Sequence, residues 1–244
     1  MISKINFQPM SKADPAHDGQ KLLVHSLFHT IQGEGPNVGK PAVFLRLGGC
    51  NLQCPGCDTE YTDGASLEPV ESILTRIRMA FGDHKGARLV VITGGEPFRQ
   101  NLYPLLHHLH ESYIQTQIET NGTLGLGEWE PMWSRWEYSS LKPQIVCSPK
   151  AGKVHHDLWK WITAYKYVLN SGSIDLSDGL PTSVLGMPAA PARPHAGFDG
   201  DVYVQGADER SPVDNEMNLE CAVASAIKHG YRLGLQMHKI AGLE

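Results

Sequence analysis

Long hydrophobic runs are absent from the 244-residue sequence. A membrane-spanning helix needs roughly 18 or more consecutive apolar residues, whereas the longest uncharged stretch, residues 179–192, is interrupted by Pro181, Pro188 and Pro191. The first residues, MISKINF, also lack the apolar segment of a secretory signal peptide. We therefore expect no membrane partner and a soluble protein of the cytoplasm.

Basic residues are also scarce. The chain has 21 Lys and Arg against 26 Asp and Glu, a formal net charge of -5, and this balance argues against binding nucleic acid through its phosphates. Glycine and proline, with 25 and 16 residues, are too few for a low-complexity chain. The length is sufficient for one large domain with a sizeable core.

Cysteine is rare and unevenly placed. Of five cysteines, Cys50, Cys54 and Cys57 fall within eight residues, whereas Cys147 and Cys221 stand alone. An odd number with this spacing is not the disulfide framework of a secreted domain. The cluster of three indicates metal or redox chemistry, and the two single cysteines lie in apolar patterns typical of core residues.

Apolar runs of strand length alternate with segments of helical periodicity. Such alternation indicates a parallel sheet covered by helices. We expect an α/β protein with about six β/α units in an incomplete (β/α)6-type barrel of parallel strands, where sites gather at the C-terminal strand ends. Strands are expected at residues 42–47, 88–93, 114–118, 145–147, 165–169, 202–205 and 232–236, and helices at 70–81, 101–112 and 214–229, the last capped by Asp214 and Gly230.

The chain shows no obvious boundary between two domains. Residues 1–20 are polar and aperiodic, which predicts a loose N-terminal extension to a single domain at residues 21–244. Residues 171–200 are rich in Gly, Pro, Ser and Ala, as expected of one long loop or lid. Trp129, Trp133 and Trp136 have helical spacing and are expected in the core.

The three clustered cysteines follow an expected strand and the pair Gly48-Gly49. Thiolates on one glycine-rich loop can converge on a soft metal centre. A [4Fe-4S] cluster held by three thiolates leaves one iron open, and that iron can bind the amine and carboxylate of S-adenosylmethionine. Two alternatives are structural zinc, with His25 or His29 as a further ligand, and a thioredoxin-type pair at Cys54 and Cys57.

The residues around the cysteines resemble the radical S-adenosylmethionine (radical SAM) superfamily and, within it, the 7-carboxy-7-deazaguanine synthases. The segment Gln32-Gly-Glu-Gly, 18 residues before Cys50, is the most selective part of this resemblance, which extends from about residue 21 to the C-terminus. The matching segments are 28–35 (FHTIQGEG), 57–59 (CDT), 92–97 (ITGGEP), 117–122 (QIETNG), 148–150 (SPK) and 235–239 (LQMHK).

This resemblance implies a radical SAM barrel and a set of cofactor-binding residues. Cys50, Cys54 and Cys57 would hold the [4Fe-4S] cluster, and the neutral oxygen of Thr59 would bind Mg²⁺. The residues that would bind S-adenosylmethionine are Gly95, Glu96, Ser148, Pro149, Lys150 and Gln205.

The resemblance also implies a substrate, 6-carboxy-5,6,7,8-tetrahydropterin. Arg46 is a single charge in an apolar strand and would grip the substrate carboxylate, although a structural ion pair is an alternative role. Gln32 and Glu34 would contact the edge of the pterin ring. The full set of implied substrate-binding residues is Ile31, Gln32, Gly33, Glu34, Arg46, Thr93, His238 and Glu244.

The implied reaction converts this pterin to 7-carboxy-7-deazaguanine with loss of ammonia, in the biosynthesis of queuosine or another 7-deazapurine. It further implies an electron donor such as flavodoxin or ferredoxin, and a homodimer. Two other functions share the cysteines: a radical SAM activase of a glycyl-radical enzyme, and a non-catalytic zinc or electron-transfer module.

Overall fold

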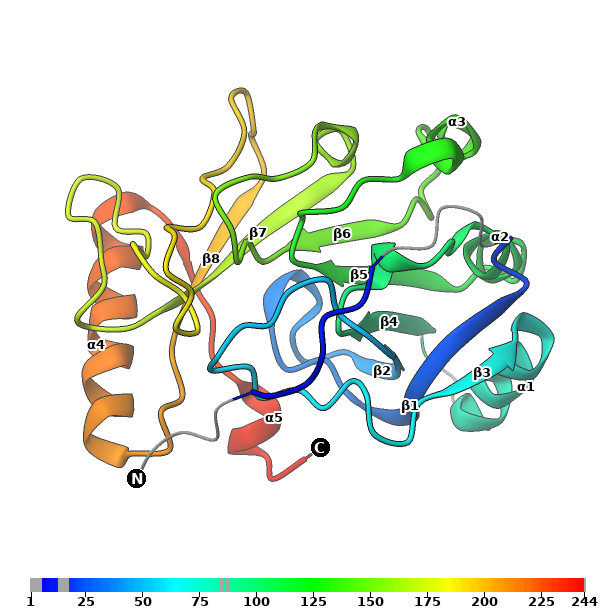
Figure 1. Ribbon diagram of the computed structural model, residues 1–244, viewed down its shortest axis with the longest axis horizontal. Helices are drawn as coiled ribbons and strands as arrows, with labels where there is room; N and C mark the ends of the chain where they lie inside the picture. Colours follow the sequence, from blue (N-terminus) through cyan, green and yellow to red (C-terminus); the bar gives the residue numbers. More distant parts are fainter. Residues whose placement is uncertain (1–5, 13–17, 84–85, 87, 244) are drawn as a thin grey trace.

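A single nine-stranded sheet lies at the centre of the part of the chain that the structure describes (Figure 1). The computed structural model describes residues 6–12, 18–83, 86 and 88–243. The strands lie in the order β3-β1-β2-β4-β5-β6-β7-β8-β9. They are β1 (Lys21–Ile31), β2 (Pro41–Leu47), β3 (Ser66–Pro69), β4 (Leu89–Gly94), β5 (Gln115–Thr120), β6 (Gln144–Cys147), β7 (Ile162–Leu169), β8 (Asp201–Gly206) and β9 (Arg232–Leu233).

The strands β2 and β4 to β9 run parallel to one another, as the sequence predicts. The antiparallel pairing of β1 with both β2 and β3 is additional to that prediction.

Among the helices that the structure describes, none has the length and apolar character of a membrane span. The α-helices are α1 (Val70–Phe81), α2 (Tyr103–Glu111), α3 (Glu130–Trp133), α4 (Pro212–His229) and α5 (Met237–Ile240), and the 3-10 turns are η1 (Gly35–Asn37), η2 (Pro97–Arg99), η3 (Gly127–Trp129), η4 (Ser134–Trp136) and η5 (His156–Leu158).

The helices at 70–81 and 214–229 are confirmed, with one correction at a helix start. Ser211, not Asp214, is the N-cap of α4, because its hydroxyl accepts a hydrogen bond from the Asp214 N–H. Gly230 ends α4 in the left-handed conformation, at φ 74°, as predicted. Short turns and the long segment 170–200 replace full helices between β5 and β8. The sheet is therefore covered by helices only in part.

The two faces of the sheet differ in chemistry, because alternate residues of a strand point to opposite faces. One face carries buried residues such as Leu45, Ile92 and Ile118, which join the helices in the main core. Trp133 and Trp136 are buried in that core, as predicted. The opposite face, called the inner face below, carries the polar side chains of Arg46, Thr93, Gln117, Glu119, Lys166 and Gln205.

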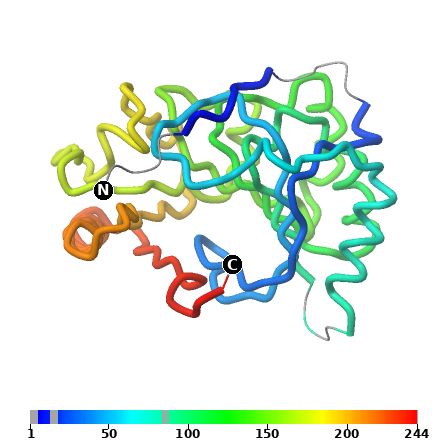
Figure 2. The backbone as a smooth tube through the Cα atoms, turned by 60° about the horizontal axis from the view of Figure 1, so that its bottom comes forward, coloured from blue at the N-terminus to red at the C-terminus, as the bar shows by residue number. Residues whose placement is uncertain are grey.

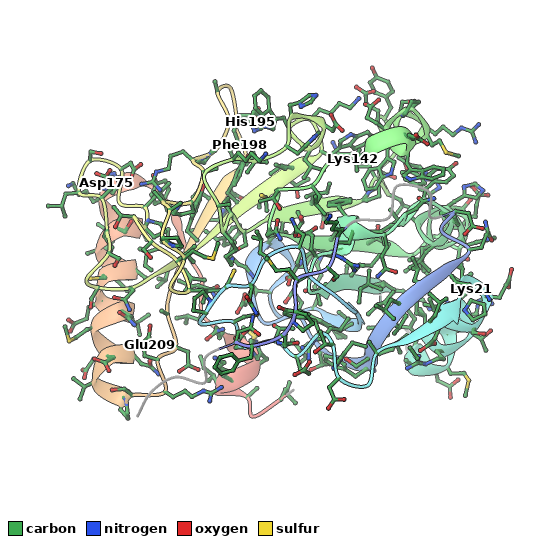
Figure 3. All side chains as sticks on the ribbon, viewed as in Figure 1. Lys21, Lys142, Asp175, His195, Phe198 and Glu209 are labelled. Atoms are coloured by element: carbon green, nitrogen blue, oxygen red, sulfur yellow. The ribbon has the colours of Figure 1, made fainter. Side chains whose placement is uncertain are left out.

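The segment between β7 and β8 is ordered by its own contacts. The Arg193 guanidinium donates to the Asp178 carboxylate from Nε at 2.6 Å. The ring of Phe198 meets that of Tyr165 edge-on at 4.9 Å, and Figure 3 shows Phe198 beside His195 near β7. Gly56 N–H donates to the Leu185 carbonyl at 2.9 Å, so this segment also touches the loop that carries the cysteines.

Candidate active site

The three clustered cysteines lie on the loop that follows β2, with Cys50 and Cys54 buried and Cys57 half-buried. The end of β4 packs directly against this loop. A Cβ atom on Gly95 would stand 2.0 Å from the Gly49 carbonyl oxygen, so only glycine permits this approach. The Glu96 N–H donates to the same oxygen at 3.0 Å. The TGGEP segment and the cysteine loop therefore form one unit.

The donor set fits an iron-sulfur cluster. All three thiols are free, and burial raises the pKa of each, to about 12 for Cys50. Thiols in such a place become ligands when a bound metal centre supplies the positive charge that stabilises the thiolates. The zinc alternative finds no support in the histidines on β1, because His25 contacts Ser26 and His29 packs against Phe81 of α1.

Glu96 is fully buried, and its carboxylate is already engaged by the chain. Oε1 accepts hydrogen bonds from Thr120 Oγ1 at 2.7 Å and from Phe98 N–H at 3.1 Å, and Oε2 accepts one from Asn121 N–H at 2.7 Å. Burial raises the pKa of this carboxyl, against the effect of these bonds. Glu96 thus fixes the ends of β4 and β5 together, a role that the sequence did not indicate.

Ser148, Pro149 and Lys150 follow the end of β6. The Lys150 ammonium donates to the Ser148 carbonyl at 3.0 Å and to its hydroxyl at 2.6 Å. Burial lowers the pKa of Lys150, and the charge of Lys166 lowers it further. The Lys150 charge in turn acts on the thiols of Cys54 and Cys57. This segment therefore brings a positive charge within electrostatic range of Cys54 and Cys57, and its role in binding S-adenosylmethionine stays a prediction.

A buried ion pair connects Glu34 to the inner face of the sheet. Lys166 Nζ lies 2.5 Å from Glu34 Oε2, while Gln236 Nε2 and Gln205 Nε2 donate to Oε1 at 2.8 and 3.2 Å. Burial alone would raise the pKa of Glu34, but the charge of Lys166 and these hydrogen bonds lower it to about 2. Glu34 is therefore an anion with both oxygens fixed in position. Gln205 belongs to this group by its contacts, although it was predicted to bind the cofactor.

A second carboxylate, Glu119, lies beside this group on β5. Oε1 accepts hydrogen bonds from Gln32 Nε2 at 3.0 Å and Gln117 Nε2 at 3.1 Å, and Oε2 accepts one from Thr93 Oγ1 at 3.2 Å. The Glu34 N–H also donates to Gln32 Oε1 at 3.1 Å. The structure thus brings the predicted residues Gln32, Glu34 and Thr93 together around two carboxylates, those of Glu34 and Glu119.

Two buried polar atoms on the inner face have no partner within the described chain. They are Arg46 Nε, a donor, and Gln205 Oε1, an acceptor. The Arg46 guanidinium lies over the ring of Phe28, 5.5 Å from its centroid, and no carboxylate of the described residues pairs with it. Because buried polar groups are normally satisfied, these atoms indicate a ligand that both donates and accepts hydrogen bonds.

The C-terminal segment closes against the loop after β1. Met237 N–H donates to the Gly33 carbonyl at 3.1 Å, and a Cβ atom on Gly33 would stand 2.0 Å from His238 Nδ1. Ile31 ends β1 opposite Pro41 and is half-buried. His238 and Gly33, which were both predicted to bind substrate, are thus neighbours, whereas Glu244 lies outside the described residues.

Thr59 is half-buried on the cysteine loop, two residues after Cys57. Its hydroxyl donates to Asp58 Oδ1 at 3.2 Å, and its carbonyl accepts a hydrogen bond from Gln8 Nε2 at 2.9 Å. The hydroxyl therefore already lies beside a carboxylate oxygen, and the two together are ligands of the kind that a hard cation prefers.

Three residues of this site were not predicted from the sequence: Lys166, Glu119 and Gln236. Lys166 offered a clear signal, a single charge within the apolar run of β7, the same signal that pointed to Arg46 on β2. Glu119 and Gln236 lie in matching segments but were given no role. Only the folded chain brings them to Glu34 and Gln32.

Comparison with known proteins agrees with this geometry. The Radical SAM superfamily matches residues 45–134. Two proteins named 7-carboxy-7-deazaguanine synthase are each 39% identical to this chain: that of Rickettsia prowazekii over all of both sequences, and that of Rhodospirillum rubrum over 95% of this chain and 96% of its own. The crystal structure of QueE from Escherichia coli has the same fold, with a TM-score of 0.63 and 21% identity over 89% of this chain and 95% of that one.

Proposed function

This chain belongs to the 7-carboxy-7-deazaguanine synthases of the radical SAM superfamily, and from this membership we propose that it converts 6-carboxy-5,6,7,8-tetrahydropterin to 7-carboxy-7-deazaguanine with loss of ammonia, in queuosine biosynthesis. The observation that carries the proposal is the polar inner face. It combines a fixed anion at Glu34 with the unpartnered atoms of Arg46 and Gln205. A pterin with a carboxylate presents complementary groups.

The family implies a [4Fe-4S] cluster and S-adenosylmethionine as cofactors. Cys50, Cys54 and Cys57 would hold the cluster. When bound, these cofactors supply the radical that takes a hydrogen atom from the substrate. Gly95 packs directly against the cysteine loop, and the segment formed by Ser148, Pro149 and Lys150 carries an ammonium whose charge acts on Cys54. These residues would bind S-adenosylmethionine.

Glu34 would bind the amino edge of the pterin ring. That edge carries N–H donors, and a carboxylate held in its ionised form is a strong acceptor for them. Lys166 keeps Glu34 ionised, and Gln205 and Gln236 orient it. Lys166 is therefore a positioning residue in this proposal, because it acts through Glu34.

Arg46 would bind the substrate carboxylate, since a guanidinium forms two parallel hydrogen bonds with a carboxylate. Thr59 would hold Mg²⁺, which would supply further positive charge for the substrate carboxylate, and Arg46 would orient the ring for hydrogen abstraction. An electron donor such as flavodoxin or ferredoxin, a homodimeric assembly and a cytoplasmic setting complete the proposal.

Anaerobic incubation tests this proposal. Cluster-loaded protein is mixed with the pterin, S-adenosylmethionine, Mg²⁺ and a reductant, and products are identified by mass spectrometry. The proposal predicts 7-carboxy-7-deazaguanine. If the protein cleaves S-adenosylmethionine but forms no deazaguanine, the substrate is wrong. A glycyl radical formed in a partner protein would then favour the activase, and a zinc-bound protein that takes up no iron would favour the non-catalytic module.

A further inference from the structure

Residues 6–12 form a short segment that crosses the cysteine loop, residues 48–62, and is called the N-terminal strap below. In Figure 1 the strap crosses the middle of the view beside this loop, and in Figure 2 it runs along the upper edge of the molecule. The sequence predicted a loose extension here, and for residues 6–12 that prediction is wrong because both backbone and side chains bond to the loop.

The strap contacts the loop at two of its cysteines. Ser11 N–H donates to the Cys50 carbonyl at 2.7 Å, and Met10 forms a parallel bridge with Cys50. At the start of the strap, Asn6 N–H donates to the Pro55 carbonyl at 2.9 Å, and Asn6 Nδ2 donates to the Cys54 carbonyl at 3.2 Å. Asn6 is itself buried, so these bonds form away from water.

Gln8 holds the part of the loop that follows Cys57. Its Nε2 donates to the Thr59 carbonyl at 2.9 Å. Its Oε1 accepts hydrogen bonds from Tyr61 N–H at 2.7 Å and Thr62 Oγ1 at 3.3 Å. One amide side chain therefore satisfies both a donor and an acceptor of the loop backbone.

The loop needs such partners because it has little regular structure of its own. Between Asn51 and Ala65 the described chain contains neither helix nor strand, so its backbone groups lack the usual partners. The far end of the strap is anchored by Arg99, whose guanidinium donates to the Ser11, Lys12 and Gly48 carbonyls at 2.9 to 3.1 Å. The strap thus links the cysteine loop to the segment that follows β4.

We propose that Gln8 and Asn6 are positioning residues that hold the cysteine loop ready to receive its cluster and place Thr59 beside it. A loop whose thiols are already in place loses less conformational entropy on binding and releases its ligand more slowly. This proposal rests on the proposed function only in taking an iron-sulfur cluster as the group bound by the loop.

The test measures how fast the cluster is lost, without substrate. Anaerobically reconstituted wild type and Gln8→Ala are mixed with an iron chelator, and iron release is followed with time. We expect Gln8→Ala to release iron about tenfold faster, because it leaves a Tyr61 donor and a Thr59 acceptor without partners. Phe7→Ala is the matched control, since Phe7 lies on the same strap with 83% of its surface exposed, and it should behave as wild type.

Two further variants make the result decisive. Gln8→Glu keeps the acceptor for Tyr61 but loses the donor to Thr59, so its iron release should lie between wild type and Gln8→Ala. Asn6→Ala, at the other end of the strap, should also release iron faster than Phe7→Ala, and it replaces Gln8→Ala in the test if that variant does not fold.

Thermal unfolding of the iron-free variants distinguishes a role in cluster binding from a role in the stability of the fold. A lower Tm with unchanged iron release would mean that the strap stabilises the fold alone, and would overturn the proposal. Iron release equal to that of Phe7→Ala would overturn it too. Iron release is measured without substrate, so its result can be interpreted even if the protein fails to make 7-carboxy-7-deazaguanine.

Discussion

Lys166 brings a positive charge to the inner face of the sheet, where its Nζ lies 2.5 Å from Glu34 Oε2. Lys166→Met keeps most of the side-chain length and removes the charge. Leaving one charge of a buried ion pair without its partner costs about 3–5 kcal/mol. Without Lys166, the carboxylate of Glu34 is therefore expected to take up a proton and lose its charge. We expect the dissociation constant for the pterin to rise at least about tenfold, with the iron content unchanged.

Titration of cluster-loaded protein with the pterin measures this effect without turnover. Lys166→Arg, which retains the charge, is the matched control and should recover much of the affinity. Equal pterin binding by Lys166→Met and wild type would mean that the ion pair does not act on the substrate.

Glu34 also makes stability depend on pH. Its pKa is lowered from 4.5 to about 2 in the folded chain, so the unfolded chain binds more protons as the pH falls. The stabilisation is complete above the unfolded pKa and is lost as the pH falls from about 4.5 through about 2. The free energy of unfolding of wild type should therefore approach that of Glu34→Gln across this window. Denaturation at a series of pH values measures the difference, with Glu216→Gln on the exposed side of α4 as control. A difference that stays constant to low pH would contradict the ion pair.

At the scale of elements, the contact between the end of β4 and the cysteine loop sets a steric limit. A Cβ atom on Gly95 would collide with the Gly49 carbonyl at 2.0 Å. Gly95→Ala is expected to lower the free energy of unfolding by at least about 1–3 kcal/mol, the usual cost of overpacking, and to reduce the iron that the protein retains. Gly172→Ala is the control, since its nearest atom would be 3.6 Å away. Chemical denaturation and iron analysis check both effects, and an unaffected Gly95→Ala would show that the loop can move aside.

Elements with a strong apolar pattern were predictable from the sequence. The core strands β2 and β4 and the helices α1 and α4 follow the period of their apolar residues. The strand β1 was missed because His25, Ser26 and His29 interrupt its pattern, and pairing with β2 and β3 stabilises it. The expected strand at 232–236 ends at Leu233, because Gln236 turns toward Glu34.

The site was predictable where a motif or a single buried charge marked it, as for the cysteines and Arg46. It was not predictable where partners come from distant strands. Glu119 joins Gln32 across 87 positions, and Gln236 joins Glu34 across 202. No local pattern encodes such pairs, since they depend on strand order. The same reason hid the strap, whose bonds reach the loop from about 50 positions away in a polar, aperiodic segment.

For the whole molecule, the two ends of the chain serve different parts of the site. The N-terminal strap bonds to the cysteine loop, whereas the C-terminal segment bonds to Gly33 and Glu34. Removing residues 236–244 takes away Gln236 and His238 but no contact of the strap. We expect this truncated protein to retain its iron and to bind the pterin at least about tenfold more weakly, because Glu34 loses a hydrogen bond and the site loses one wall.

Iron analysis and pterin titration of the same preparation separate the two effects. Ile240→Ala is the matched control, since Ile240 lies on the same C-terminal segment with 75% of its surface exposed, and both its iron content and its pterin affinity should equal those of wild type. Gln8→Ala should show the opposite emphasis to the truncation, with faster iron release and, while loaded, a smaller loss of pterin affinity, because Gln8 acts on the substrate only through Thr59. If the truncation also released iron faster, the two ends would not act independently. Binding of the cluster and binding of the substrate would then be coupled through contacts of both ends of the chain.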